Sequence, residues 1–189
     1  MRYQKELPNK KTGIAMPKLK KMYSNIDNPH VQQLMRLIET QSKQTLVNWC
    51  CDYALKVMLP IYQKHYPADE RPDEAVNAAK DWLAGKIKLP EAKKFILACH
   101  EVAREAENNP AAQAAARAIG QAASSIHSGT HALGIAFYGA PAVAYDMVAG
   151  ETQEVYDKLA ETELANIELS LRAACVENEP NPVKVKWNC

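Results

Sequence analysis

PAAQAAARAIGQAASSIHSGTHALGIAFYGAPAVAYDMVA, residues 110–149, is the stretch that decides the fold. It carries only two formally charged side chains, Arg117 and Asp146, and alanine dominates it, with glycine interspersed. A helix that is apolar all round belongs in the protein interior, and small side chains let neighbouring helices approach closely. The stretch therefore predicts a central, buried Ala/Gly-rich helical hairpin or bent helix pair, wrapped by the other helices, with the bend at Gly129 or Gly120.

On the N-terminal side of this stretch, start and stop signals divide the chain into helices. Asn-Pro pairs, in which asparagine caps the helix and proline takes its first position, stand at residues 28–29 and 109–110. Pro72 and Pro90 open two further helices, and Gly85 ends the first of them as a left-handed cap. Within these bounds apolar side chains recur at steps of three and four, as one buried helix face requires.

Two more helices complete the pattern. One begins with Ser42 as its cap, and Pro60 is expected to kink it or to shorten its last turns. The last helix begins near Glu151 and runs to about Asn178. Strict alternation of apolar and polar residues occurs only at residues 183–187, which are too few to form a sheet alone. The sequence thus predicts an all-α, single-domain bundle of about seven helices.

Charge divides the chain into three predicted parts. Residues 1–27 form an irregular basic N-terminal arm, residues 28–178 the all-α domain and residues 179–189 a C-terminal tail. Residues 151–178 hold seven acidic and two basic side chains, the reverse of the basic N-terminal end. An acidic helix face is usually a solvated surface, but this one could also dock the chain's own arm or a basic protein partner. The candidate partner surface is Glu154, Glu161 and Glu168.

The bulk composition argues against several classes of protein. The formal net charge is +1, so global charge predicts neither a nucleic-acid partner nor a membrane partner. The longest apolar stretch, residues 132–150, contains Pro141 and Asp146 and consists of small side chains, unlike a membrane span. The odd number of cysteines, without a C-x-x-C pair, and the lack of an apolar signal core predict reduced thiols and a cytoplasmic location.

Three histidines are the candidate metal ligands. His127 and His131 are four residues apart, which places both imidazoles on one face of a helix, and His100 could supply a third ligand. Ser128 stands where the H-E-x-x-H motif has its glutamate, and no carboxylate-rich motif completes the set. The alternative is that these histidines form hydrogen bonds inside the bundle, and no cofactor is predicted.

A narrow polar stripe crosses the alanine-covered helix. It consists of Gln113, Arg117, Gln121 and Ser124, and Ser128, His131 and Tyr138 extend it if the helix continues. A buried arginine needs an acidic partner, because an unpaired buried charge is costly. The candidate partners are Asp52, Asp81, Asp146 and Glu105. The stripe is therefore either a structural network or the lining of a ligand pocket.

Motifs for nucleotide binding and for hydrolysis are incomplete. Gly129 and Gly134 have the spacing of a P-loop, but Ile135 and Ala136 follow in place of lysine and serine or threonine. The chain contains no G-x-S-x-G segment, which would present a nucleophilic serine. Nothing in the sequence specifies an enzyme.

Several segments together resemble a known family. They are Trp49-Cys50-Cys51-Asp52-Tyr53-Ala54, Asp69-Glu70-Arg71-Pro72, Ala98-Cys99-His100-Glu101-Val102-Ala103-Arg104-Glu105-Ala106, Ala116-Arg117-Ala118-Ile119-Gly120-Gln121-Ala122 and His127-Ser128-Gly129-Thr130-His131-Ala132-Leu133-Gly134, followed by Tyr138. Their order over residues 45–150 is similar to that of the immunity proteins of bacterial polymorphic toxin systems, specifically the all-helical immunity family five. The basic arm and the acidic last helix lie outside this resemblance.

The resemblance implies a small cytoplasmic protein that binds and neutralises a cognate toxin by occlusion, without catalysis. The family-motif positions, which form a candidate pocket, are Asp69, Arg71, His100, Arg104, Arg117, Gln121, His127, His131 and Tyr138. Two alternatives stay open. One is a helical protein, or even an enzyme, that binds a small molecule or a metal through its His/Arg cluster. The other is a homo-oligomeric scaffold whose alanine-rich hairpin packs between subunits.

Overall fold

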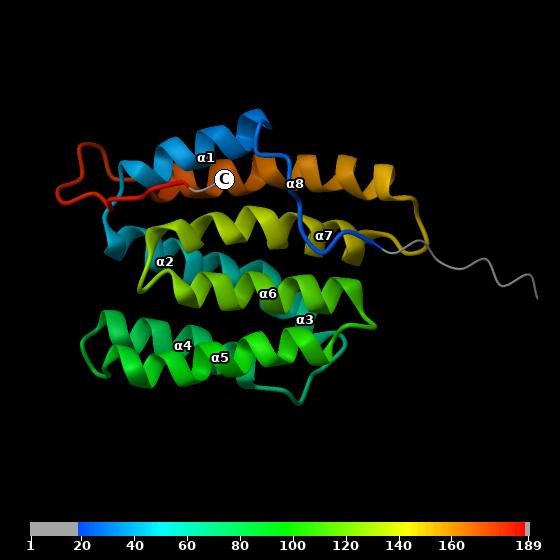
Figure 1. Ribbon diagram of the computed structural model, residues 1–189, viewed down its shortest axis with the longest axis horizontal. Helices are drawn as coiled ribbons and strands as arrows, with labels where there is room; N and C mark the ends of the chain where they lie inside the picture. The colour runs from blue at the N-terminus through cyan, green and yellow to red at the C-terminus, as the bar shows by residue number, and fades with distance from the viewer. Residues whose placement is uncertain (1–18, 188–189) are drawn as a thin grey trace, which may run out of the picture.

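Seven helices and one short 3-10 segment build the described part of the chain, residues 19–187, in the computed structural model (Figure 1). The elements are α1 (Pro29–Glu39), the continuous helix α2 (Lys43–Tyr53), η1 (Ala54–Met58) and α3 (Leu59–Gln63), then α4 (Arg71–Leu83), α5 (Leu89–Glu105), α6 (Pro110–Ser124), the 3-10 segment η2 (Gly129–Leu133), the continuous helix η3 (Ile135–Gly139) and α7 (Ala140–Met147), and α8 (Gln153–Ala174). Residues 19–187 contain no strand, only an isolated β-bridge between Ser42 and Pro182. The predicted all-α bundle is confirmed.

Helix α6 is the centre of the bundle. It contacts α2, α3, α4, α5 and α7, and every one of its alanines is buried. In Figure 1, α1 and α8 lie along one edge of the molecule, and α4 and α5 lie along the opposite edge. The predicted hairpin is formed by α6 and η3–α7, and its bend lies at residues 125–128, next to Gly129, whereas Gly120 lies inside α6. None of the described helices is both long and apolar enough to cross a membrane.

Helix boundaries follow the local signals. Asn28 Oδ1 accepts a hydrogen bond from the amide of His30 at 2.9 Å, and Asn109 Oδ1 accepts one from the amide of Ala112 at 3.0 Å. Gly85 follows α4 with a φ of 73°, in the left-handed region that favours glycine. Because these contacts are made within a few residues of one another, the sequence alone places the starts of α1 and α6 and the end of α4.

Two helices contain a π-helical turn shortly before a proline. The turn η1 is followed by Leu59 and Pro60, and the turn η3 is followed by Ala140 and Pro141. A proline lacks a backbone donor and its ring crowds the carbonyl four residues earlier, so a wider turn relieves the clash. The helix therefore continues past Pro60, and the predicted disturbance lies in the turn before it. The turn η3 also contains Tyr138, one of the family-motif residues.

Helix α8 ends at Ala174, about one turn before the expected end at Asn178. Cys175 is extended, and the amide of Val176 donates a hydrogen bond to Oε1 of Gln41 at 2.7 Å. Asn178 then adopts a φ of 52°, which turns the chain back. Hydrogen bonds to the connection between α1 and α2 thus replace the helical ones.

The C-terminal tail packs on the start of α2. The carboxylate of Glu179 accepts hydrogen bonds from the amide and the hydroxyl of Ser42 at 2.7 and 2.8 Å and from the hydroxyl of Thr45 at 2.6 Å. The indole of Trp187 donates to Glu39 at 2.6 Å. An acidic side chain from the tail therefore caps the N-terminus of α2, where a negative charge is favoured.

Replacing Glu179 with glutamine is expected to lower the free energy of unfolding by about 1–2 kcal/mol, because a charged helix cap becomes neutral. Urea denaturation followed by circular dichroism measures the change. Glu177→Gln, at an exposed position of the same tail, is the matched control and should alter stability by less than about 0.5 kcal/mol. Equal losses in the two variants would contradict the capping role of Glu179.

The described end of the basic arm, residues 19–27, packs against α7 and α8. The ammonium of Lys20 pairs with Asp157 at 2.8 Å. Tyr23 is buried, and its hydroxyl donates a hydrogen bond to Glu161 at 3.3 Å. Part of the basic arm therefore docks on the acidic helix of its own chain, and the rest of the expected arm lies outside the described residues.

The cysteines of the described chain are free thiols. Cys50, Cys51 and Cys99 are buried, and Cys175 is partly exposed. Burial raises the pKa of Cys51 and of Cys99 to about 12, so neither thiol ionises at neutral pH. This agrees with the expectation of reduced thiols, and Cys189 lies outside the described residues.

Candidate functional site

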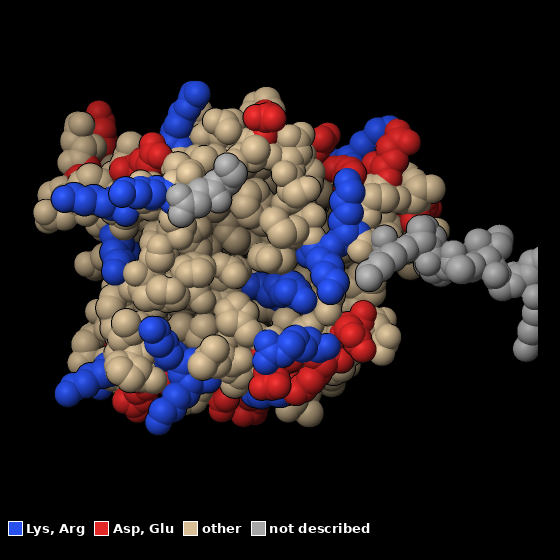
Figure 2. Space-filling view, viewed as in Figure 1, with Lys and Arg blue, Asp and Glu red and all other residues tan. Residues whose placement is uncertain are grey.

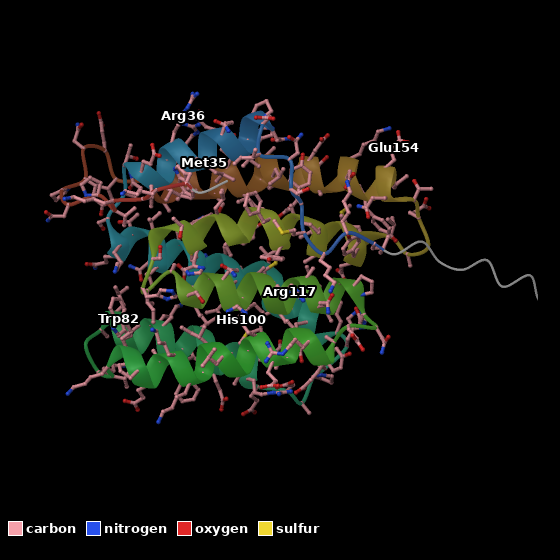
Figure 3. All side chains as sticks on the ribbon, in the orientation of Figure 1. Met35, Arg36, Trp82, His100, Arg117 and Glu154 are labelled. Carbon is pink, nitrogen blue, oxygen red and sulfur yellow. The ribbon has the colours of Figure 1, made fainter. Side chains whose placement is uncertain are left out.

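The polar stripe of α6 divides into a structural part and an open part. Gln113 donates a hydrogen bond to the carbonyl of Ala103 at 2.8 Å, and Ser124 donates one to a carbonyl one turn earlier in α6 at 2.7 Å. Between these two residues, Arg117 and Gln121 are only half-buried. Arg117 lies on the face turned toward the viewer in Figure 3. The open part of the stripe is therefore Arg117 and Gln121.

Gln121, His131 and His127 form a chain of hydrogen bonds across the bend of the hairpin. Gln121 Oε1 lies 2.6 Å from His131 Nδ1, and His131 Nε2 lies 3.1 Å from His127 Nε2. Because an amide oxygen only accepts, His131 donates from Nδ1. In a neutral His131, Nε2 then accepts the hydrogen bond from Nε2 of His127.

Burial keeps the histidines of this region uncharged. Loss of solvent, together with the nearby imidazoles of His127 and His100, lowers the pKa of His131 to about 4. Desolvation, followed by nearby cationic side chains, also lowers the pKa of His100 and that of His127. These side chains therefore add little positive charge to the region at neutral pH.

Acid is expected to destabilise the fold through His131. An unfolded histidine has a pKa of 6.5, so between pH 6.5 and about 4 the unfolded chain binds a proton that the folded chain does not. Stability is then lost as the pH falls through this window, by up to about 1 kcal/mol per pH unit for one such group. Thermal melts at pH 7.5, 6 and 5 should show a smaller loss for His131→Asn than for the wild type. An equal loss would assign the effect to other groups.

Two glycines allow the close approach on which this cluster depends. A Cβ at Gly120 would lie 2.6 Å from Cε1 of His100, and a Cβ at Gly134 would lie 2.6 Å from Cγ of Gln121. Both distances are well below an ordinary contact between carbon atoms. Gly120 therefore lets α5 bring His100 against α6, and Gly134 lets the start of η3 approach Gln121. The sequence marks both glycines, but spacing alone does not reveal which side chain each one admits.

Arg117 has no acidic partner among residues 19–187. Its Nε is buried there without a hydrogen-bond acceptor, and its guanidinium carbon lies 5.9 Å from the centre of the Tyr138 ring. The expected partners pair with other cations: Asp52 with Lys80, Asp81 with Lys86, Asp146 with Lys64 and Glu105 with Arg71. None of the four expected carboxylates pairs with Arg117, because each lies beside a basic side chain of its own.

A pocket of about 310 Å³ is lined by Gln121 and Tyr138, two neighbours of Arg117, although Arg117 itself is not one of its lining residues. Its lining residues are Gln121, Thr130, Leu133, Gly134, Phe137, Tyr138, Lys186 and Trp187. Tyr138 connects the two features, because its ring faces the guanidinium of Arg117 and also lines the pocket. Figure 2 shows this face as a broad uncharged area with Lys and Arg side chains beside it and acidic side chains toward its upper and lower margins.

The tail supplies the part of the pocket that is hardest to foresee from the sequence. Lys186 and Trp187 line it together with residues of α6, η2 and η3. The sequence assigns no functional role to the C-terminal tail. Its only local sign of a binding site is an aromatic residue next to a lysine. Phe137 is likewise a pocket residue, although it reads as one apolar residue among many in the hairpin.

The D-x-R-P segment, Asp69-Glu70-Arg71-Pro72, does not line this pocket. Arg71 binds Asp69 through two hydrogen bonds of 2.9 and 2.7 Å, and it binds Glu105 through two of 3.1 and 2.6 Å. Hydrogen bonds from Arg71 and from the hydroxyl of Tyr62 lower the pKa of Asp69. This network joins the start of α4 to the end of α5, which is a structural role. Arg104 is exposed and pairs at 3.4 Å with a glutamate one turn earlier.

Three histidines do not meet as metal ligands in this arrangement. Within residues 19–187, no three His, Cys, Asp or Glu side chains are grouped so that they could hold a metal ion. His127 and His131 contact each other through ring nitrogens, and the ring of His100 lies against Gly120. The arrangement corresponds to the alternative expectation for His127 and His131, hydrogen bonding inside the bundle.

The acidic surface of α8 is partly used within the fold. Glu168 has a side chain only 15% exposed, and it contacts His30 at 2.7 Å and Arg172 at 2.6 Å. Glu154 is 80% exposed, and Glu161 also remains at the surface. A partner can therefore reach Glu154 and Glu161 more readily than Glu168.

A family model described as Imm-5 like putative immunity protein matches residues 36–169 of the chain. The match extends beyond residues 45–150 and includes most of α8, so the expectation that the acidic last helix lies outside the family is wrong. No match was found among curated proteins or among solved structures. Because the matched residues make up more than half of the chain and include every motif position named above, the chain belongs to the Imm-5 like immunity protein family.

Proposed function

We propose that the chain binds a cognate toxin protein in the cytoplasm and neutralises it by occlusion, without catalysis. Membership of the Imm-5 like immunity family over residues 36–169 is the observation that carries this proposal. An immunity protein implies a toxin as its partner. Occlusion requires only a complementary surface, which agrees with a sequence that specifies no reaction.

The exposed motif residues support a binding surface. Arg117 and Gln121 are partly exposed although the alanines beside them in α6 are buried, and His127 is exposed in the bend that follows α6. Arg117 keeps its charge without an acid from residues 19–187, an arrangement that fold stability alone disfavours. Arginine and aromatic side chains often dominate the energetics of protein interfaces. Tyr138 and Trp187 supply aromatic rings to the adjacent pocket.

The acidic surface at Glu154 and Glu161 is a second candidate for the contact. It would favour a basic region of the toxin, whereas the surface around Arg117 would favour an acidic one. A double reversal, Glu154→Lys with Glu161→Lys, distinguishes the two surfaces. Weaker toxin binding would place the contact on α8, and unchanged affinity would remove that surface from consideration.

Binding of a small molecule is the second candidate function, and the pocket supports it. Its volume of about 310 Å³ lies at the lower end of the range for small-molecule sites, about 300–1,000 Å³. Native mass spectrometry of the purified protein should then show a bound compound that withstands desalting. The scaffold alternative has less support, because the alanines of α6 are buried within a single chain and are not available to pack between subunits.

Co-expression tests toxin neutralisation directly. A candidate cognate toxin domain is expressed in a bacterial host, alone and together with the chain. We expect the toxin alone to arrest growth and co-expression to restore it. Arrest that persists in the presence of folded chain would contradict the proposal.

The stoichiometry of neutralisation separates occlusion from catalysis. Purified chain is added in increasing amounts to a fixed amount of toxin, and the residual toxin activity is measured. Occlusion predicts that inhibition is complete only when one chain is present per toxin molecule. Complete inhibition at a small fraction of that amount would indicate turnover and would contradict a non-catalytic role.

A further inference from the structure

Within residues 19–187, no acidic side chain pairs with the charge of Arg117. Removing a guanidinium from water costs free energy that an ion pair or a full set of hydrogen bonds normally offsets. Arg117 is half-buried, its Nε has no acceptor, and no ion pair within residues 19–187 includes it. Arg36 also lacks an ion pair in that part of the chain, but it is exposed, so water solvates its charge.

The surroundings of Arg117 add donors rather than acceptors. The guanidinium carbon of Arg117 lies at a cation–π distance of 5.9 Å from the centre of the Tyr138 ring, and no ion pair within residues 19–187 uses the guanidinium. Gln121 Oε1 is occupied by His131, so the amide NH2 of Gln121 is what remains for a ligand in the pocket. Lys186 brings a second cation from the tail, and the pocket lining contains no carboxylate.

The apolar part of the pocket lining strengthens the attraction between these donors and an anion. Leu133, Phe137 and Trp187 are large apolar or aromatic side chains in the lining. They reduce the water around a bound group, and electrostatic attraction is stronger where water is excluded. Beside the half-buried Arg117, an anion would therefore gain more than it would beside a fully exposed arginine.

We propose that Arg117 and the adjacent pocket bind an oxyanion, either a carboxylate or a phosphate group. Arg117 and Lys186 supply positive charge, and Gln121 supplies a neutral donor. A planar guanidinium can bind two oxygens of such a group at once. The oxyanion has two sources, an acidic side chain of the toxin or a free small molecule. The first source rests on the proposed toxin binding, and the second does not.

Titration with inorganic phosphate tests the pocket without a toxin. Sodium phosphate is added against sodium chloride of equal ionic strength, and the Nε–H signals of the arginines are followed by 15N–1H NMR. We expect a saturable shift of the Arg117 signal in the wild type and in Arg36→Gln. Arg117→Gln should show no saturable shift of any arginine signal. Arg36→Gln is the matched control, because it removes the same charge from an exposed site.

The affinity for the toxin domain tests the other source. Calorimetry with Arg117→Gln is expected to give a dissociation constant at least tenfold higher than that of the wild type, whereas Arg36→Gln should change it less than twofold. Arg117→Lys, which keeps the charge but loses the planar fork, should fall between them. Thermal melts control for folding, and Arg117→Gln should melt at the wild-type temperature or above it, because an unpaired charge is removed.

Each outcome has a defined meaning. A phosphate response with unchanged toxin affinity assigns the site to a free anion, and reduced toxin affinity without a phosphate response assigns it to a toxin side chain. If Arg117→Gln changes neither measurement, the anion site is overturned. If the wild type binds no toxin, the proposed function fails, and the phosphate titration still decides whether the pocket binds an anion.

Discussion

Replacing Gly134 with alanine is expected to lower the free energy of unfolding by about 3 kcal/mol. The added Cβ would lie 2.6 Å from Cγ of Gln121 and closer still to its Cβ. The Cβ of Gln121 is bonded directly to the backbone of α6 and cannot rotate away, so α6 and the start of η3 would have to separate. That separation would loosen the buried hairpin and displace Gln121 from the pocket.

Gly120→Ala is the matched control for this prediction. Its added Cβ would also meet a side chain at 2.6 Å, but the atom is Cε1 of His100, at the end of a side chain that can turn. Alanine also favours a helix over glycine by up to about 1 kcal/mol. The loss for Gly120→Ala should therefore stay below about 1.5 kcal/mol in urea denaturation. Equal losses at the two positions would contradict the close packing assigned to Gly134.

The second large effect is expected from Arg71→Ala, which should lower the free energy of unfolding by about 2 kcal/mol. The change removes the hydrogen bonds to Asp69 and Glu105. It also leaves the carboxylate of Asp69, only 17% exposed, with Tyr62 as its remaining side-chain partner. Because Arg71 is itself partly exposed, the loss is smaller than for a fully buried pair. Hydrogen exchange should increase in the connection before α4.

Arg104→Ala is the control for Arg71→Ala. Arg104 is also a family-motif residue at the end of α5, but it is exposed and its only ion pair in the described chain is with Glu101. Its removal should change stability by less than about 0.5 kcal/mol. Loss of toxin binding in Arg71→Ala at unchanged stability would contradict the structural role of the D-x-R-P segment and would place it in the binding surface.

The fold could largely be predicted from the sequence, because its helices are specified by nearby residues. The caps at Asn28 and Asn109 set two helix starts, and the uncharged alanine surface of α6 leaves the interior as its only favourable place. The exceptions arise from distant contacts. The end of α8 depends on Gln41, a residue far from it in the chain, and periodicity carries no information about such a contact.

The candidate site could be predicted only in part. Arg117 and Gln121 share a stripe because they are four residues apart on α6, which spacing alone establishes. His131 reaches Gln121 for a different reason: the helix stops at Ser124, and the bend folds η2 back onto α6. Trp187 comes from the C-terminal tail, far from α6 in the sequence, and its only local signal is the neighbouring lysine.

The most informative departure is that none of the four expected carboxylates pairs with Arg117. A buried arginine is expected to find its acid within the same chain when stability alone is selected. The four candidate carboxylates pair with other cations in the structure. Where a local rule fails without compensation, a functional cause is expected, and here the cause proposed is an anion that arrives from outside.

Titration of the cognate toxin domain into the purified wild-type chain by isothermal calorimetry is the most direct test of the account. The predicted result is saturable binding with one chain per toxin molecule, at least tenfold weaker in Arg117→Gln and unchanged in Arg36→Gln. No heat of binding and no co-elution of the two folded proteins at micromolar concentration would contradict it.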